Sequence, residues 1–337
     1  MLKKAILLFT LCLIWVSKTN AQDAQFSQFY AAPLYLNPGF AGATVEHRFI
    51  VNNRIQWPSL PKTFTTYNFS YDFNMHNLNS GLGILATSDR AGIANLQSTT
   101  INAIYSYKIK FNHGWIVSPG IQFGYNIRTL DFDKLIFGDQ INFDDNLGST
   151  IDPDFKFLEN QNSFDFSSGI MVYNKNAWFG FSAHHLNKPN NSVINEGQSA
   201  LPTKYSLHAG YRITLFQGPT SGDRLSSIAP SFIYKKQGEF DQLDIGFHFH
   251  YNPIMAGFWY RGIPIKQDVD DNSSRDAIII LFGLKFEQFD VGYSYDMTTS
   301  KLGGSTGGAH EISLTYQFNT KHRKKSKPQK FIPCPAY

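Results

Sequence analysis

The chain has 337 residues, of which 42% are hydrophobic and 15% aromatic, including 30 Phe and 17 Tyr. Its net charge of +4 arises at the two ends: residues 1–21 hold three basic residues, residues 319–337 hold six, and neither stretch holds an acid. Residues 22–318 carry 21 Lys+Arg against 26 Asp+Glu, a net charge near −5, which excludes a basic nucleic-acid-binding surface spread over the fold. Cys12 and Cys334 are the only cysteines, which excludes a cysteine-pair zinc site.

Residues 1–21 have the pattern of a signal peptide. Two lysines precede an apolar run from Ala5 to Val16, and Thr19-Asn20-Ala21 places small residues at positions −3 and −1 of a cleavage site. The alternative is a membrane-anchoring helix, but the run is shorter than the roughly 20 residues that span a bilayer. The mature chain is therefore predicted to begin at Gln22, and no later stretch is apolar enough for a transmembrane helix.

Residues 22–46 form an aromatic segment that lacks strand alternation. Four aromatic side chains precede an Asn-Pro-Gly turn, in which Pro38 fixes φ and Gly39 tolerates a positive φ. The segment is therefore expected to lie outside any regular sheet.

Residues 47–318 alternate between apolar and polar side chains, as in 243–251, where Leu, Ile, Phe, Phe and Tyr are separated by Asp, Gly, His and His. Because successive side chains of a strand point to opposite faces, each segment has one apolar and one polar face. We predict an all-β fold, a single transmembrane outer-membrane β-barrel of about 14 antiparallel strands. The strands are expected at 47–57, 63–73, 80–90, 96–109, 114–128, 163–173, 177–186, 203–215, 226–235, 240–251, 254–262, 276–286, 289–297 and 309–318.

The connectors between these segments alternate in length. Most connectors after even-numbered strands are tight, whereas 129–162, 187–202, 263–275 and 298–308 follow odd-numbered strands and are long. Short periplasmic turns and long external loops are typical of outer-membrane barrels, and an even strand count then puts both termini in the periplasm. The stretches 216–225 and 236–239 fit this pattern poorly. A soluble β-sandwich is the alternative fold, but it offers no reason for the alternating connectors.

The two segments that flank the barrel are the candidate functional regions. The aromatic segment 22–46 either plugs or caps the lumen or forms an arm that binds a periplasmic partner; its candidate residues are Phe26, Phe29, Tyr30, Asn37, Pro38 and Gly39. The tail 319–337 is basic and then apolar, and it is read either as a periplasmic docking peptide or as a solvated tail. Its candidate partner-binding residues are Lys324, Lys325, Phe331, Cys334, Pro335 and Tyr337.

Both ends of the mature chain resemble the PorP/SprF family of type IX secretion and gliding-motility outer-membrane proteins. The resemblance lies in Gln25-Phe-Ser-Gln-Phe29, in Asn37-Pro-Gly-Phe-Ala-Gly42, in Arg54, Gln56 and Trp57, and in Cys334-Pro335 with the final Tyr337. It implies a component of a secretion machine that anchors periplasmic ring or peptidoglycan-binding components, or that serves secreted surface adhesins. The alternative function is a transport barrel, either a porin or a channel for hydrophobic compounds.

Chemical motifs give no sign of an enzyme. The glycine-rich stretch 303–308 lacks the Gly-Lys-Ser/Thr of a phosphate-binding loop, and we assign no catalytic residue, cofactor or metal. His248 and His250 would share the lumen face of one strand. They could contribute to a metal site, but polar residues of any kind are expected on that face. The acidic residues of loops 144–154 and 268–271 lack the spacing of a calcium-binding loop.

Overall fold

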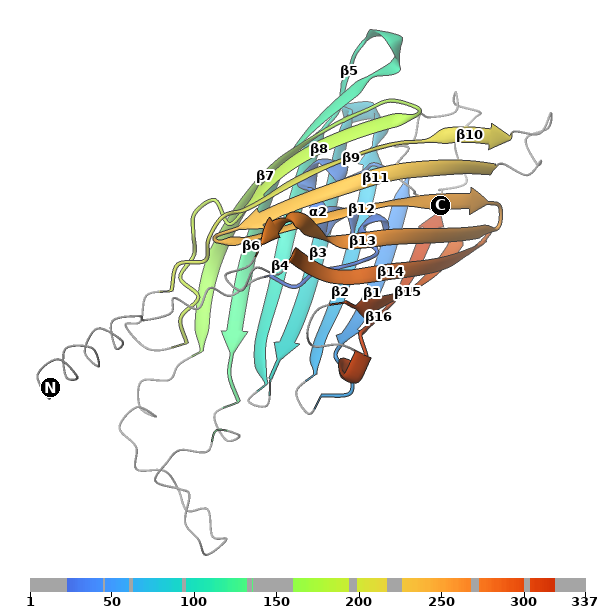
Figure 1. The fold of residues 1–337 in the computed structure, drawn as a ribbon. Helices are drawn as coiled ribbons and strands as arrows, with labels where there is room; N and C mark the ends of the chain where they lie inside the picture. Colours follow the sequence, from blue (N-terminus) through green and yellow to red (C-terminus); the bar gives the residue numbers. More distant parts are fainter. Residues whose placement is uncertain are drawn as a thin grey trace, which may run out of the picture.

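The computed structural model describes residues 23–44, 46–60, 63–92, 95–131, 135, 160–193, 199–216, 226–267, 273–299 and 304–318. These residues form one closed β-barrel that surrounds an N-terminal segment (Figure 1). Among them, no helix is both long and apolar enough to cross a membrane.

Fourteen antiparallel strands close the ring, as the alternation predicts. β1 pairs with β16, β9 pairs with β11, and every other neighbour in the ring follows chain order. β5 continues β4 beyond Lys108, and β10 continues β9 beyond Arg212. The strands are β1 (His47–Gln56), β2 (Phe64–Met75), β3 (Ser80–Ala91), β4 (Leu96–Tyr107), β5 (Ile109–Lys110), β6 (Ile116–Thr129), β7 (Gln161–Tyr173), β8 (Ala177–His184), β9 (Lys204–Tyr211), β10 (Ile213–Phe216), β11 (Ser226–Gln237), β12 (Phe240–Tyr251), β13 (Ile254–Gln267), β14 (Ser273–Phe286), β15 (Phe289–Thr298) and β16 (Ala309–Phe318).

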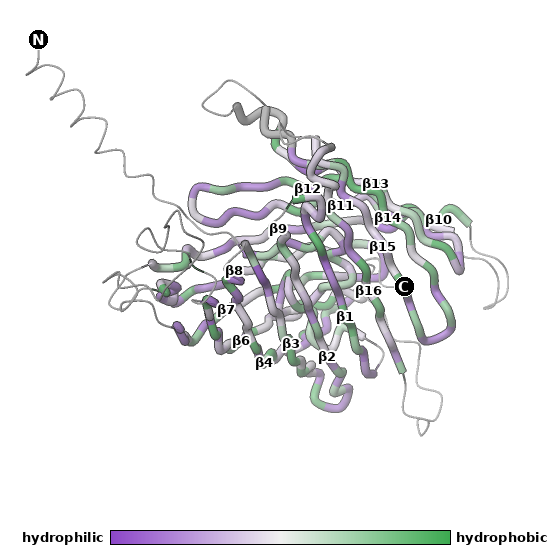
Figure 2. Tube along the Cα trace, turned by 90° about the horizontal axis from the view of Figure 1, so that it is seen from below, coloured by the Kyte–Doolittle hydropathy of each residue, from purple (hydrophilic) through white to green (hydrophobic). Residues whose placement is uncertain are grey.

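The period-two pattern of the sequence separates the two faces of the wall. On β6, Gln122 points into the barrel and is 5% exposed, whereas its neighbour Phe123 points outward and is 58% exposed. Figure 2 shows hydrophobic and hydrophilic positions alternating along the strands. The barrel therefore has an apolar outer face and a largely polar lumen face, as expected for strands in contact with lipid.

The two rims of the barrel differ. We call one rim the turn end: it holds the tight connections 174–176, 252–253 and 287–288, and it is where β1 begins and β16 ends. The opposite rim is the loop end. Of the two connectors that fit the length pattern poorly, the tight turn at 238–239 lies at the loop end, and 217–225 lies outside the described residues.

The N-terminal segment, residues 23–44 with Glu46, passes through the barrel from the loop end to the turn end; we call it the lumen segment. It contains three short helical turns, η1 (Phe29–Ala31), α2 (Pro33–Leu36) and η2 (Pro38–Phe40). Pro33 and Pro38 each occupy a first helical position, where a missing N–H costs nothing. Its apolar side chains form the centre of the buried core with residues from the surrounding strands.

The course of this segment separates the ends of the described chain. Asp23 contacts Lys204 at the start of β9 and Gln237 at the end of β11, both at the loop end. Phe318 lies at the turn end, beside His47. The prediction that both termini lie on one side therefore fits the first and last strands but not Asp23, because the chain crosses the lumen before β1 begins.

Three further short turns complete the described structure. They are η3 (His76–Leu78), η4 (Asn112–Gly114) and η8 (Gly304–Thr306). The first two lie in turn-end connections, and the third lies in the loop-end connection between β15 and β16.

Candidate functional site

The filled lumen is the candidate functional site. Toward its loop end, Ser27 joins a buried charge network on the wall. The Ser27 hydroxyl donates to Asp296 (2.6 Å) and accepts from Arg54 and Arg261 (2.9 Å each), and its backbone N–H donates to Glu311 (2.7 Å). Buried charges are costly unless they are paired and hydrogen-bonded, and here arginines and carboxylates from four strands balance one another. The lumen segment is therefore part of the network that neutralises the wall.

Aromatic packing fixes the next turn of the segment. The ring of Phe29 lies edge-on to Trp259, with centroids 4.9 Å apart, and to His248 at 5.6 Å. Tyr30 makes an edge contact with the same histidine, and its hydroxyl donates to the amide oxygen of Gln28 (3.0 Å). Edge-to-face geometry is favourable for such rings, and these contacts bury η1 against β12 and β13.

The Asn-Pro-Gly motif forms the contact with β6, β7 and β8. The Asn37 amide donates to the backbone carbonyls of Ile170 (3.2 Å) and Phe181 (3.1 Å), while its oxygen accepts from the N–H of Gly39 (2.8 Å). On the wall, the Ser118 hydroxyl donates to the carbonyl of Gly39 (2.9 Å). The motif thus terminates α2 and ties the backbone of η2 to the barrel.

Glycines on the lumen face make room for this backbone. A Cβ atom at Gly120 would lie 2.5 Å from the carbonyl carbon of Pro38, and one at Gly169 would lie 2.3 Å from the Asn37 side-chain oxygen. A Cβ at Gly81 would meet the carbonyl of Ala41 at 2.1 Å. Such close approach is possible only without a side chain, so the wall is shaped to fit the segment.

Where the segment leaves the lumen, charged side chains of the wall form hydrogen bonds with its last turn. The Gly42 N–H donates to Asp72 (2.8 Å), which also accepts two hydrogen bonds from Arg48 (2.9 and 3.0 Å). The ammonium group of Lys108 donates to the Gly42 carbonyl and to Asn74 (2.7 Å). The turn end of the lumen segment is therefore anchored to β2 and to the β4–β5 junction.

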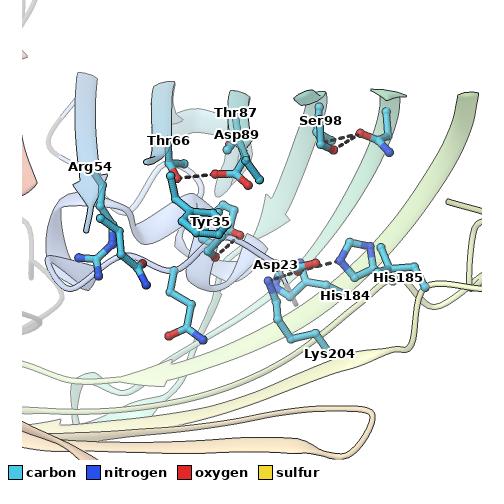
Figure 3. A pocket seen from close by; sticks show the side chains of 18 of the residues that line it. Asp23, Tyr35, Arg54, Thr66, Thr87, Asp89, Ser98, His184, His185 and Lys204 are labelled. Carbon is cyan, nitrogen blue, oxygen red and sulfur yellow. Dashed lines mark hydrogen bonds and ion pairs between the residues drawn. The ribbon is translucent and has the colours of Figure 1, made fainter. Parts of the chain in front are cut away.

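An ionic cluster holds the other end of the segment, at the loop end (Figure 3). Asp23 bonds to His185 (2.9 Å) and to Lys204, and His185 also lies 3.1 Å from Asp165. Burial would raise the pKa of Asp23, but the two cations hold it well below its usual value. Burial would lower the pKa of His185, but the Asp23 and Asp165 carboxylates raise it to about 9.

This cluster borders a cavity of about 580 Å³ at the loop end. Tyr35 of the lumen segment forms part of its floor, and its hydroxyl donates to the carbonyl of Ala24 (2.6 Å). Asp89, Asn126, Arg128 and Trp57 contribute to its walls and rim. Polar and apolar side chains line the cavity together, and the lumen segment borders it on the barrel side.

The candidate residues predicted from the sequence fall into two groups. The six on the lumen segment are all buried and lie together in the lumen, against the wall: Phe26, Phe29, Tyr30, Asn37, Pro38 and Gly39. The six tail residues, Lys324 to Tyr337, lie outside the described residues. A partner could contact the first group only if the lumen segment left its present position.

Sequence reasoning assigned no site role to the wall residues that bind the segment, and it named Arg54 only for the family resemblance. Arg54, Arg261, Asp296 and Glu311 are all at most 4% exposed, yet each stands at a polar position of an alternating strand. Charged residues at lumen positions were the available signal. Within the described residues no group of three His, Cys, Asp or Glu side chains is arranged to hold a metal ion, and His248 is enclosed by aromatic rings.

The sequence and the fold both resemble known outer-membrane proteins. The family described as type IX secretion system membrane protein PorP/SprF matches residues 18–316. No curated protein matches. Among solved structures, the outer membrane protein Omp33 of Acinetobacter baumannii is 8% identical, with a TM-score of 0.40, and the match covers 82% of this chain and 100% of that one. A FadL homologue of Pseudomonas aeruginosa is 12% identical (TM-score 0.43; 84% and 93% covered), and a mutant of the TodX monoaromatic hydrocarbon channel is 10% identical (TM-score 0.42; 85% and 92% covered).

The family match extends over nearly the whole of the described chain, from before the lumen segment into the last strand. It agrees with the closed barrel of 14 antiparallel strands, an architecture of the outer membrane. The chain therefore belongs to the PorP/SprF family of type IX secretion system membrane proteins and is an outer-membrane component of that system.

Proposed function

We propose that this barrel is a closed, non-enzymatic anchor or adaptor of the type IX secretion and gliding machinery. In this role it binds periplasmic components or secreted surface adhesins, and it carries no substrate through its lumen. In this role the turn end faces the periplasm and the loop end faces the cell exterior, and residues 1–21 are a signal peptide that is cleaved off.

The filling of the lumen by the N-terminal segment carries this proposal. The segment contacts the wall on all sides: Ser27 bonds to β1, β13, β15 and β16, Asn37 contacts β7, β8 and β9, and Gly42 bonds to β2. A porin needs an open lumen, whereas an anchor needs a stable, rigid barrel. The buried charges and close glycine contacts favour the second requirement.

A transport barrel is the alternative function. The cavity of about 580 Å³ at the loop end favours it, because a transporter needs an entry site for its substrate. Transport would require the lumen segment to move, and that movement would break the Ser27 and Gly42 hydrogen bonds with buried charged side chains. Leaving such charged groups buried without partners is unfavourable, so we regard the anchor as the better supported function.

The tail 319–337 is proposed to be a periplasmic docking element that the barrel does not need. β16 ends at Phe318 and is paired along its length with β1, so every described wall hydrogen bond lies before the tail. The lysines and arginine of the tail would attract an acidic partner surface electrostatically, and added salt would screen this attraction. Phe331 and Tyr337 would add apolar contact area.

Affinity purification from native cells in mild detergent, followed by mass spectrometry, tests the proposed function. The intact protein is expected to bring down components of the secretion machinery. A variant truncated after residue 319 is expected to reach the outer membrane as a heat-modifiable barrel while losing most of these partners and reducing secretion. Full partner recovery by the truncated variant would argue against the tail as the docking element, and purification of the intact protein without any partner would argue against the adaptor.

A further inference from the structure

A groove of about 370 Å³ lies at the turn end, where the lumen segment leaves the barrel. Its three walls are the segment exit at residues 42–44, the β2–β3 connection at residues 74–79, and the hairpin of residues 108–116 that includes β5. Figure 1 shows this hairpin extending beyond the neighbouring strands. The groove is separate from the lumen cavity, which lies at the opposite rim.

The hairpin supplies exposed aromatic area to the groove. Phe111 is 56% exposed and Trp115 is 39% exposed, and both line it, with Ile116 beside them. The backbone N–H of Phe111 donates to the Trp115 carbonyl (2.9 Å), which holds the two residues across the hairpin end. Two large apolar side chains on the concave side of a projecting hairpin indicate a surface that binds another apolar group.

The charge of the groove has one sign. Lys108 and Lys110 line it, and no Asp or Glu stands among its lining residues. The Lys110 ammonium is exposed, and among the described residues its hydrogen-bond partner is the neutral side chain of Asn79 (2.6 Å). An incoming carboxylate would therefore meet an uncompensated cation, which favours an acidic ligand.

We propose that this groove binds an acidic peptide segment of a partner protein on the turn-end side of the membrane. One apolar side chain of that segment would lie between Phe111 and Trp115, and a neighbouring carboxylate would pair with Lys110. The inference rests on the proposed adaptor function and specifies where on the barrel one partner binds and which chemistry it presents.

The chain's own tail fits this groove poorly. Residues 319–337 carry six basic residues and no acid, so their charge has the same sign as that of the groove. Like charges brought together in a partly desolvated site disfavour binding. An acidic segment from another protein matches both the charge and the apolar character.

The site also touches the lumen segment. Lys108 lines the groove and its ammonium bonds to the Gly42 carbonyl, while Gly42 itself forms part of the groove wall. A bound segment would therefore cover the point at which the lumen segment emerges. Docking and retention of the lumen segment are expected to stabilise each other, because Gly42 and the Lys108 that binds it both form part of the groove wall.

Fluorescence anisotropy of labelled peptides with the purified full-length protein in detergent tests the proposal. The test peptide carries glutamates around one phenylalanine, its counterpart replaces every glutamate with lysine, and a third peptide is residues 319–337. The acidic peptide is expected to bind, and Lys110→Glu is expected to weaken it at least about tenfold, as for a lost charge pair at an interface. Phe111→Ser should weaken binding, and so should added salt.

The matched control is Lys236→Glu, which reverses another exposed lysine on β11, far along the ring from the groove, and should leave binding unchanged. Both lysines are exposed, so neither reversal should unfold the barrel, and heat-modifiable migration checks this. Absence of binding by the acidic peptide, equal loss in the two lysine variants, or preferential binding of the tail peptide would each overturn the proposal.

Photo-crosslinking in native cells separates this inference from the proposed function. A photoreactive phenylalanine at position 111 is expected to crosslink to an acidic segment of a secretion component, and Lys110→Glu should abolish the product. The same probe at Phe123, on the outer face of β6, should give no such product. If Lys110→Glu retains every partner of the wild-type protein, the groove is not the binding site, although the adaptor function is unaffected. If the wild-type protein has no partner, the adaptor function itself is contradicted.

Discussion

Gly120 on β6 lies directly against Pro38 of the lumen segment: a Cβ atom at position 120 would be 2.5 Å from the Pro38 carbonyl carbon and 2.6 Å from the Gly39 nitrogen. Both neighbours are backbone atoms, which cannot rotate away as a side chain can. The barrel wall and the lumen segment therefore pack so closely that one additional methyl group would not fit between them.

Gly120→Ala should loosen the lumen segment without opening the ring of strands. An extra methyl group at so tight a contact is expected to cost about 1–3 kcal/mol. Limited chymotrypsin digestion should then cleave at the segment's aromatic residues, most of which are buried in the wild-type protein. Ala103→Val, which adds bulk on the outward face of the neighbouring strand β4, is the control and should leave the digestion pattern unchanged.

Glu311→Gln should destabilise the anchored segment through hydrogen bonding. Glu311 accepts the N–H groups of Ser27 (2.7 Å) and Gln28 (3.2 Å), and an amide has only one acceptor oxygen. A buried donor left without a partner costs about 1–3 kcal/mol, so the temperature of the heat-modifiable transition should fall. Glu239→Gln, at an exposed turn, should not change it, and an equal shift in both variants would contradict the assigned role.

The ionic cluster at the loop end predicts a pH dependence. His185 has a pKa of about 9 in the folded protein, above its usual value near 6.5, so the stability that it contributes is full below about pH 6.5 and is lost as the pH rises through about 9. Asp23 has a lowered pKa, so its contribution is present at neutral pH and is lost only in acid, below the usual carboxyl range.

Raising the pH from 6.5 to above 9 should therefore lower the melting temperature of the wild-type protein. His185→Gln should melt lower at pH 6.5 and show a smaller change over this range. Melting curves across the pH series check both points. The account of the cluster is wrong if the variant and the wild-type protein lose stability in parallel.

The barrel could be predicted from the sequence because its signal is local. Alternation within each segment located all fourteen strands, and even the breaks at Lys108 and Arg212 lie inside segments that were predicted as continuous. Membrane strands expose one face to lipid and one to the lumen, so the sequence of each strand indicates which of its side chains face the lumen.

The site was harder to predict because its contacts join distant residues. Ser27 and Glu311 are 284 positions apart, and nothing near either residue indicates the other. The aromatic segment and its Asn-Pro-Gly turn stand out in the sequence, but the course of the segment from the loop end to the turn end depends on glycines and charged side chains spread over many strands of the wall. That dependence explains why Asp23 lies away from the end predicted for it.

The assignment of the two rims can be checked by cysteine labelling in a Cys334→Ser background. Glu239→Cys lies in the exposed β11–β12 turn at the loop end, and Lys175→Cys lies in the exposed β7–β8 turn at the turn end. A membrane-impermeant maleimide should label position 239 in intact cells and position 175 only after the outer membrane is permeabilised. The reverse order would invert the proposed topology.

Planar-bilayer recording of the purified protein, with and without residues 23–42, tests most directly the claim that the lumen segment closes the barrel. The segment carries Ser27, Asn37 and Gly42, so its deletion removes the described hydrogen bonds across the lumen. The intact protein is expected to pass little steady current, and the deletion variant, once its heat-modifiable migration shows a folded barrel, is expected to conduct. A large, stable conductance in the intact protein that the deletion leaves unchanged would contradict the account.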